Sequence, residues 1–310
     1  DKLAEYKSTL TNDELEELVK KTKELKEYQD TPSSQEDLEK IPMLELSDIK
    51  REPAKDYNDV KSVDGIKIVH HNIFTNKIAY INMSFDTKCV PDELIPYMGL
   101  LGSTLSLMDT KNYTYPELTN EININCGGLA TGTALYSDKV DFSKNTIVYE
   151  VKSKALYEKV PFVLGMMEEI MYNTRFDDYK RLKEIIARIK SRLEASLMGQ
   201  GHSIAMLECC AQFSESAYYS DILRGYKYYE FIKKLDEEFE QNKTQIVDKL
   251  NKLVGYIFNK DNVIVSLTAD DEGYDCFVKA LSAKSCNIKD EHYNTAVRSF
   301  IPVNVKTGYT

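Results

Sequence analysis

The hydrophobic pattern of the chain changes its period near Val60, and this change limits the possible folds more than any other feature. Before it, apolar residues recur at helical spacing from Leu15 to Tyr28, behind a capping box that begins at Thr11. After it, apolar and polar residues alternate, as they do in strands that bury one face. We therefore expect a helical N-terminal region followed by a domain that contains a β-sheet.

The N-terminal region is expected to contain two helices. The long helix should end at Thr31-Pro32, because proline cannot continue a helix. Ser33, with Glu36 three residues later, predicts the cap of a short second helix, which Pro42 would end. Residues 1–55 are therefore predicted to form a helical hairpin linker and an extended arm.

Six strands are predicted after the change of period. Asp64-Gly65 is a typical two-residue hairpin turn, and Thr75-Asn76 indicates a second turn. These turns predict that the first three strands form an antiparallel meander. The predicted strands span residues 60–63, 66–69, 78–85, 129–136, 146–151 and 263–267.

Helical spacing dominates the rest of the chain. Helices are expected over residues 94–108, 115–126, 156–172, 177–198, 202–216, 226–239, 243–258 and 272–283, with Asp177 as the cap of the fourth. Strands that are neighbours in sequence, and helices that arrive in blocks, favour an α+β fold. We predict a two-layer sandwich over residues 56–285, in which an antiparallel sheet carries helices on one face. Residues 286–310 should begin a linker to a following domain.

Charge and cysteine content restrict the partners and the compartment. The net charge of -10 disfavours nucleic acid and anionic membranes as partners. No run of about 20 apolar residues predicts a membrane span or signal peptide. The cysteines show no C-x-x-C pair and are expected to be reduced, which favours the cytoplasm. They are Cys89, Cys126, Cys209, Cys210, Cys276 and Cys286.

The histidines do not predict a metal site. His70 and His71 are adjacent on a predicted strand, so their side chains should point to opposite faces. His202 and His292 are expected to be isolated. No serine or cysteine lies in a recognisable setting for a nucleophile. We therefore predict no catalytic, cofactor-binding or metal-binding residue in this chain.

Two further patterns have structural interpretations. The glycines at residues 199–202 indicate a break between two helices, because no strand precedes them. Gly127-Gly128 and Gly132 predict a strand whose backbone another strand, or a bound peptide, can approach closely. The carboxylate pairs Glu168-Glu169 and Glu237-Glu238 are expected to be solvated on charged helical faces.

A family resemblance rests on the helix that follows the third strand. Residues 96–110, PYMGLLGSTLSLMDT, lead through a second helix to Cys126-Gly127-Gly128. This order resembles the pitrilysin and insulinase family of zinc metallopeptidases, and in particular its presequence-protease branch. In the catalytic half of that family the helix carries H-x-x-E-H, two zinc-binding histidines and a general base. The matching positions here are Leu100, Ser103 and Thr104.

Other segments extend the resemblance along nearly the whole chain. Residues 6–10, 28–32 and 41–49 are similar to the hairpin that links the two halves of presequence proteases. Segments at 201–203, 213–214, 225–229 and 262–270 are similar to bacterial members, and Glu168 lies near the place of the third zinc ligand in a catalytic half. The resemblance implies the hinge hairpin and the third homologous domain, which keeps the fold without the motif.

The resemblance implies a function within a larger protein. The chain would be a non-catalytic domain of an intracellular zinc metalloendopeptidase that degrades short unfolded peptides, and it would form chamber wall and hinge. Zinc would lie in the catalytic half of the parent and not in this chain. The catalytic half, the fourth domain and unfolded peptides would be its partners, and weak self-association is expected. Both chain ends resemble cuts in a longer polypeptide.

Two alternatives remain open at this point. The chain could be a zinc-less structural or peptide-binding assembly subunit of the same fold. It could also be an unrelated enzyme whose site is assembled from scattered residues. An H-x-x-E-H motif encoded upstream of Asp1 would favour the metallopeptidase, and turnover lost on a single substitution would favour the unrelated enzyme.

Overall fold

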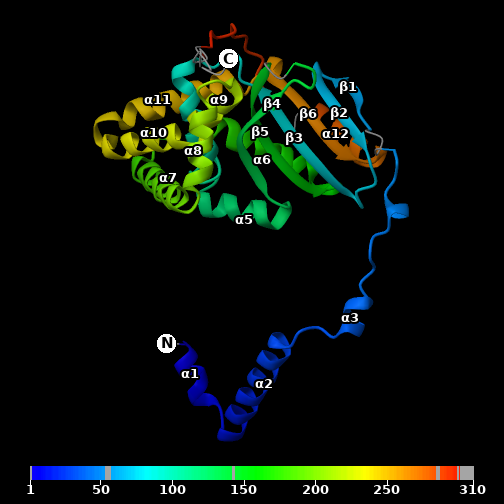
Figure 1. Cartoon of the computed structure of the whole chain (residues 1–310). Coiled ribbons are helices and arrows are strands. Elements are labelled where there is room, and N and C mark those ends of the chain that lie inside the picture. The colour runs from blue at the N-terminus through cyan, green and yellow to red at the C-terminus, as the bar shows by residue number, and fades with distance from the viewer. Residues whose placement is uncertain (1, 53–56, 142–143, 284–286, 299, 301–310) are drawn as a thin grey trace, which may run out of the picture. The chain divides into compact units, whose positions relative to one another are not determined.

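The computed structural model describes residues 2–52, 57–141, 144–283, 287–298 and 300 (Figure 1). The chain divides into two compact units, residues 1–55 and residues 56–310. Within the described residues, no helix is both long and apolar enough to cross a membrane. The five cysteines in the described ranges are free, and Cys286 lies outside these ranges.

The first unit contains the helices α1 (Lys2–Thr9), α2 (Asn12–Asp30) and α3 (Gln35–Glu39) and the 3-10 turn η1 (Leu46–Asp48). The predicted capping box is confirmed: Thr11 N donates to Glu14 Oε2 at 2.8 Å, and Glu14 N donates to Thr11 Oγ1 at 3.4 Å. The predicted cap of the short helix is wrong by one residue. Ser34 has the extended backbone of a cap, and its Oγ accepts from Asp37 N at 3.2 Å.

Neither α2 nor α3 buries a side chain. The salt bridges on α2 are exposed pairs such as Lys21–Glu17 at 2.7 Å, and pairs of this kind contribute only about 0.3–0.5 kcal/mol each. The apolar side chains Met43, Leu44 and Leu46 are more than four-fifths exposed. The helices of this unit are therefore stabilised by their caps and local contacts, without a core of their own.

The described part of the second unit forms one six-stranded sheet with the order β1-β2-β6-β3-β5-β4. The strands are β1 (Asp59–Val63), β2 (Ile66–Asn72), β3 (Ile78–Asp86), β4 (Leu129–Ser137), β5 (Asn145–Leu156) and β6 (Val263–Ala269). Each predicted strand is present, and the predicted Asp64-Gly65 turn has positive φ values at both residues. The pairing is antiparallel except between β2 and β6.

The predicted three-strand meander is wrong, because β6 lies between β2 and β3. Ile68 pairs with Val265 of β6, which in turn pairs with Met83 of β3. The link from β2 to β3 therefore spans two strand spacings, roughly 10 Å, which its residues 73–77 easily cover. Ile73 N donates to Ala269 O at 3.4 Å, where this link passes the end of β6. The apolar residues of β6 favour this central position, where they become buried.

The helices of the second unit are α4 (Ile95–Thr104), α5 (Tyr115–Asn125), α6 (Val160–Tyr172), α7 (Tyr179–Gly199), α8 (Gly201–Cys210), α9 (Glu215–Arg224), α10 (Tyr226–Glu237), α11 (Phe239–Ile257) and α12 (Asp271–Ser282). Asp178, not Asp177, caps α7, and its Oδ1 accepts from Arg181 N at 3.0 Å. The predicted helix 202–216 ends at Cys210. Ser214 begins α9 because its Oγ accepts from Ala217 N at 3.4 Å, and α9 was not predicted as a separate helix.

One face of the sheet carries the core. On β3, Ala79, Ile81, Met83 and Phe85 are at most 2% exposed, whereas Tyr80 on the opposite face is 44% exposed. The buried residues of the strands form one cluster with those of α4, α6, α11 and α12, and Figure 1 shows α6 and α12 on the same side of the sheet. The predicted α+β architecture, with helices on one face, is confirmed.

Residues 287–298, where we expected a linker to begin, contact the second unit. The guanidinium group of Arg298 donates to Val90 O at 3.0 Å and to Thr87 O at 2.7 Å. Ala296 N donates to Lys88 O at 2.8 Å, and Lys260 N donates to Lys289 O at 2.8 Å. This segment is therefore held against the loops next to β3 and β6.

Candidate functional site

The three positions that match the zinc motif lie on α4, but their side chains have different surroundings. Leu100 and Thr104 are fully buried, and Thr104 Oγ1 donates to Leu101 O at 3.0 Å. Ser103, the next residue round the helix, lines a cavity at the surface of the second unit. Only this one of the three side chains therefore faces a space that a ligand could enter.

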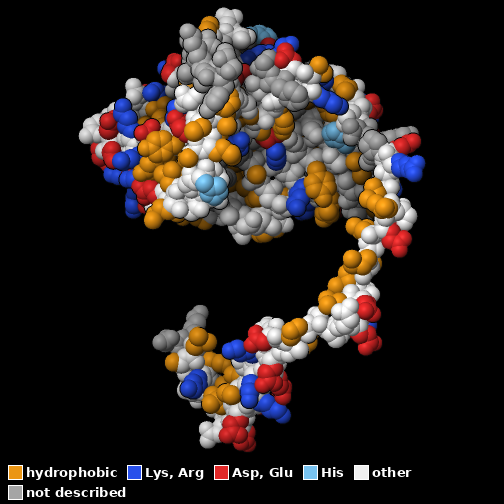
Figure 2. All heavy atoms as spheres, viewed as in Figure 1, with side chains coloured by type: hydrophobic (Ala, Val, Ile, Leu, Met, Phe, Trp, Pro, Cys, Tyr) orange, Lys and Arg blue, Asp and Glu red, His pale blue; other side chains and the backbone are white. Residues whose placement is uncertain are grey.

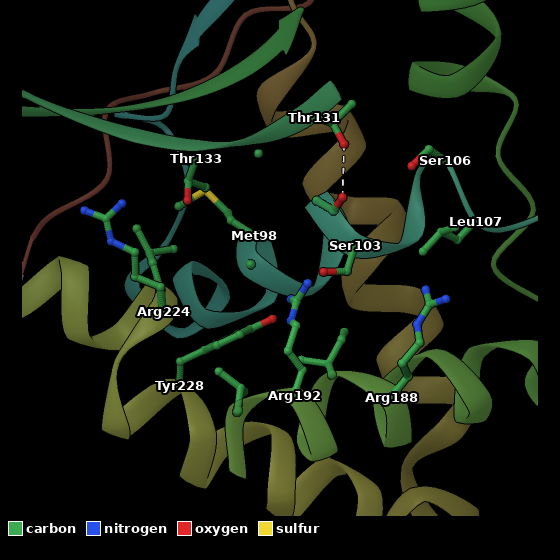
Figure 3. Close-up of a pocket in the computed structure, with 16 residues that line it drawn as sticks. Met98, Ser103, Ser106, Leu107, Thr131, Thr133, Arg188, Arg192, Arg224 and Tyr228 are labelled. Carbon is green, nitrogen blue, oxygen red and sulfur yellow. Dashed lines mark hydrogen bonds between the residues drawn. The ribbon is translucent and has the colours of Figure 1, made fainter. Parts of the chain in front are cut away.

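This cavity, which we call the α4 cavity, has a volume of about 500 Å³. Its walls come from α4, β4, α7, the end of α9 and the start of α10 (Figure 3). It is lined by Met98, Gly99, Gly102, Ser103, Ser106, Leu107, Thr131, Gly132, Thr133, Arg188, Ile189, Arg192, Leu193, Leu223, Arg224 and Tyr228. The lining thus combines hydroxyl groups, arginines and aliphatic side chains.

Two glycines allow β4 to lie directly against α4. A Cβ atom added to Gly102 would lie 3.3 Å from the Cα atom of Gly132. Beside this contact, Thr131 Oγ1 donates to Gly102 O at 3.1 Å. We predicted that glycine in this strand permits a close approach by a strand or a peptide, but the neighbour is a helix. A Cβ atom on Gly132 would meet no atom within 4 Å, so space remains on the cavity side of β4.

Three arginines give the α4 cavity its charge. Arg188 and Arg192 are four residues apart on α7, which places them on the same side of the helix. Arg224 is the last residue of α9, and its Nη2 donates to Ser220 Oγ at 3.4 Å. The lining includes no Asp or Glu, and no ion pair among the described residues involves these three guanidinium groups.

Tyr228 adds a buried hydroxyl group to the lining. Its side chain is 4% exposed, and its hydroxyl has no hydrogen-bond partner among the described residues. Burial raises the pKa of Tyr228, so the phenol is neutral and can donate a hydrogen bond. The ring packs against α4, where a Cβ atom at Gly99 would lie 2.8 Å from it.

The residues of the α4 cavity do not fit a zinc ion. Zinc in proteins is held by His, Cys, Asp or Glu side chains, and none of these lines the cavity. The three guanidinium groups would also repel a cation. The cavity offers hydrogen-bond donors and positive charge, which suit an anionic group.

A second cavity of about 450 Å³ lies on the open face of the sheet, beside Tyr80, Lys152 and Lys154. On the same face, the carboxylate of Glu150 accepts from Asn82 at 2.9 Å and from Lys152 at 2.6 Å. Burial would raise the pKa of Glu150, but these hydrogen bonds outweigh it and hold the pKa below its usual value. The charge of Glu150 is thus balanced by protein groups.

The histidine predictions are partly wrong. His70 and His71 point to opposite faces as predicted: His70 Nε2 lies 2.9 Å from Ala269 O, and His71 Nε2 lies 3.0 Å from Ser266 Oγ. His292 is not isolated, because its Nδ1 is hydrogen-bonded to Asp261, which raises its pKa. Asp290 lies close to this pair, and all three side chains are exposed. Sequence spacing did not predict this contact, because the tail at 287–298 folds back onto the loop before β6.

The carboxylate pairs also differ from their prediction. Glu237 and Glu238 are exposed, but Glu169 is 6% exposed and accepts hydrogen bonds from Asn112 and Asn173. Glu168 accepts from Asn287 N at 2.8 Å. Glu169 therefore fixes the loop between α4 and α5, and it lies outside the α4 cavity. The predicted helix break at 199–202 is confirmed, since α7 ends at Gly199 and α8 begins at Gly201.

Sequence reasoning missed the arginines of the α4 cavity. Arg188 and Arg192 could have been found from their spacing beside Ile189 on an amphipathic helix. Arg224 gave no such signal, because the packing of α9 against α4 brings it to the same cavity. Tyr228 was recognised only as part of a similar segment.

The comparison with protein families identifies the chain. A family model for a region associated with peptidases of family M16, subfamily C, matches residues 1–235. The chain belongs to this family. Protein HypA of Clostridium perfringens is 37% identical to this peptidase-associated chain over 298 residues, which are 94% of the chain and 30% of that relative. Presequence protease 1 of Arabidopsis thaliana is 29% identical and matches 86% of the chain and 25% of its own length.

Other relatives place this peptidase-associated chain in the same branch. The mitochondrial presequence protease of Saccharomyces cerevisiae is 25% identical, over 79% of the chain and 25% of its own length. The predicted resemblance to the presequence-protease branch is confirmed. The chain spans about a quarter to a third of the length of these relatives. A crystal structure of a conserved protein from Enterococcus faecalis V583 has the same fold, with a TM-score of 0.53 at 11% identity over 76% of the chain and 54% of that structure.

Proposed function

We propose that this chain is the hinge hairpin and the non-catalytic third domain of a zinc metalloendopeptidase that degrades short unfolded peptides. The α4 helix carries the proposal: it has the place of the motif helix, but it presents Leu100, Ser103 and Thr104 where the motif would supply two histidines and a glutamate. Zinc and the general base would then lie in the catalytic half of the parent.

In this proposal, the second unit forms part of the wall of a peptide-enclosing chamber. Two cavities, the α4 cavity and the one on the open sheet face, support a surface that contacts peptides. The first unit would act as the hinge between the halves. Its exposed apolar side chains, such as Leu44 and Leu46 at 88% exposure (Figure 2), support packing against other parts of the parent or weak self-association.

The partners that we propose are the catalytic half and the fourth domain of the same polypeptide, together with unfolded peptide substrates. The free cysteines support a reducing, cytoplasmic compartment for this chain. The net charge of -10 argues against nucleic acid and anionic membranes as partners.

The test is to measure zinc content and cleavage of an unstructured fluorogenic peptide by the purified chain, alone and mixed with the catalytic half. We expect no bound zinc and no cleavage for the chain alone, and a higher chelator-sensitive rate when the two are mixed. Stoichiometric zinc, or chelator-sensitive cleavage by the chain alone, would overturn the proposal. Unchanged activity of the catalytic half on mixing would instead favour an assembly subunit.

A further inference from the structure

The α4 cavity has a charge opposite to that of the chain as a whole. The chain carries a net charge of -10, yet Arg188, Arg192 and Arg224 line this cavity without any acidic residue. Figure 3 shows the side chains of Arg188 and Arg192 rising from α7 toward α4, with Arg224 at the opposite end. Guanidinium groups bind carboxylates through paired, charge-assisted hydrogen bonds, so this cavity is suited to an anionic group.

The unpaired hydroxyl of Tyr228 is a second, independent observation that indicates a ligand. A buried hydroxyl without a hydrogen-bond partner is disfavoured and is rare in folded proteins. Tyr228 is 4% exposed and has no such partner among the described residues. In Figure 3 its hydroxyl end points toward the side of the cavity where Arg192 and Ser103 lie. An acceptor oxygen at this place would satisfy both Tyr228 and Arg192.

Size and the apolar lining favour an organic anion over an inorganic one. The cavity volume is about 500 Å³, whereas a small ion occupies a space comparable with the roughly 30 Å³ of a water molecule. Met98, Leu193 and Leu223 contribute apolar surface next to the arginines. A ligand that carries both a carboxylate and an apolar side chain would contact both kinds of surface.

We propose that the α4 cavity binds the C-terminal carboxylate of an unfolded peptide, with the last side chain of the peptide on the apolar wall. Arg192 and Arg188 hold the carboxylate, and the hydroxyl of Tyr228 donates to it. This inference rests on the proposed function, because it takes a peptide as the occupant. It adds that one end of the peptide is recognised by this non-catalytic domain.

The experiment measures the binding of a short, fluorescently labelled peptide to the whole chain by fluorescence anisotropy. The peptide contains no acidic side chain and ends in leucine, either with a free carboxylate or with an amide. We expect the acid to bind about tenfold more tightly than the amide, which corresponds to about 1.4 kcal/mol. Arg192→Ala and Arg188→Ala should each remove most of this preference while leaving amide binding unchanged.

Two further variants separate recognition from folding. Arg175→Ala is the matched control, because Arg175 is an exposed arginine that pairs with Asp177 at 3.6 Å and does not line the cavity. It should retain the preference for the acid. Tyr228→Phe removes only the unpaired hydroxyl, so it should weaken acid binding without lowering the midpoint of thermal unfolding.

The possible outcomes are distinguishable. Equal affinity for acid and amide would overturn the carboxylate site, while leaving peptide contact by this domain intact. No binding of either peptide would overturn the inference, and cleavage assays on the mixed halves would still test the proposed function. Competition by millimolar inorganic phosphate without a preference for the acid peptide would show a general anion site and would also overturn the inference.

Discussion

Glu169 on α6 allows a test of how one buried carboxylate holds the second unit together. Its Oε1 accepts from Asn112 N at 2.9 Å, and its Oε2 accepts from Asn112 Nδ2 and Asn173 Nδ2, both at 2.8 Å. Asn112 lies in the loop that connects α4 to α5, and Asn173 follows the end of α6. Replacing Glu169 therefore leaves three donors without their acceptor.

The expected loss of stability follows from these contacts. Hydrogen bonds to a charged group contribute about 1.5–3 kcal/mol each, and donors left unpaired cost about 1–3 kcal/mol. Because water can reach part of the loop after the change, we expect Glu169→Ala to lower the free energy of unfolding by about 3 kcal/mol at pH 7. Glu169→Gln, which keeps one acceptor oxygen, should lower it by about 1–2 kcal/mol.

The same contacts predict a pH dependence. Burial would raise the pKa of Glu169, but hydrogen bonds from Thr110, Asn173 and Asn112 outweigh it and lower the pKa. A carboxylate whose pKa is lowered by folding contributes stability above its unfolded pKa, about 4.3, and this contribution is lost as pH falls through the folded pKa. The difference between wild type and Glu169→Gln should thus be largest at pH 7 and should shrink below about pH 4.

Urea unfolding followed by circular dichroism at a series of pH values measures this difference. Glu237→Gln serves as the control, because Glu237 is exposed on α10 and its replacement removes the same charge. It should change the free energy of unfolding by less than about 0.5 kcal/mol. A Glu169→Gln loss no larger than that of the control, or a loss that stays constant down to the lowest pH, would refute the reasoning.

Three further predictions concern single positions. Gly128, at φ +104°, should lose about 1–2 kcal/mol of unfolding free energy on substitution by Ala, whereas Gly199→Ala at the end of α7 should lose none, as thermal unfolding of both variants would show. Phe258, which is fully buried against Phe85 and Tyr149, should lose about 3–5 kcal/mol on substitution by Ala; exposed Phe74→Ala should be nearly neutral, and equal urea midpoints would contradict this. The imidazole of His292 should titrate above its ordinary pKa because Asp261 stabilises the charged form; Asp261→Asn should return the NMR titration midpoint to about 6.5, and no downward shift would be contrary evidence.

The strands and most helices could be predicted because their signals are local. The Asp64-Gly65 turn needs positive φ at both residues, and the alternation in β3 already separates the buried residues from Tyr80. The place of β6 could not be predicted in this way. Its residues are separated from β2 and β3 by most of the helices, and the alternation alone does not distinguish a central strand from an edge strand.

The candidate site divides in the same way between local and tertiary information. The motif positions could be read from the sequence because they lie within five consecutive residues of one helix. The arginines that define the α4 cavity come from α7 and α9, and only the packed structure brings them to α4. The buried state of Glu169 was missed for a related reason, since the loop that carries Asn112 covers a carboxylate that the helix pattern alone places on a charged face.

The chemistry of the α4 cavity suggests why loss of the motif need not leave an inert surface. A zinc site requires acceptor atoms that converge on a cation, whereas this cavity presents guanidinium and hydroxyl donors that favour an anion. Replacing the ligands on α4 alone would produce a neutral cavity. The arginines on α7 and α9 reverse its sign, and with it the class of ligand that the cavity can bind. In a peptidase whose other half holds zinc, such a reversal would let one domain cut the peptide chain while the second holds its carboxylate end.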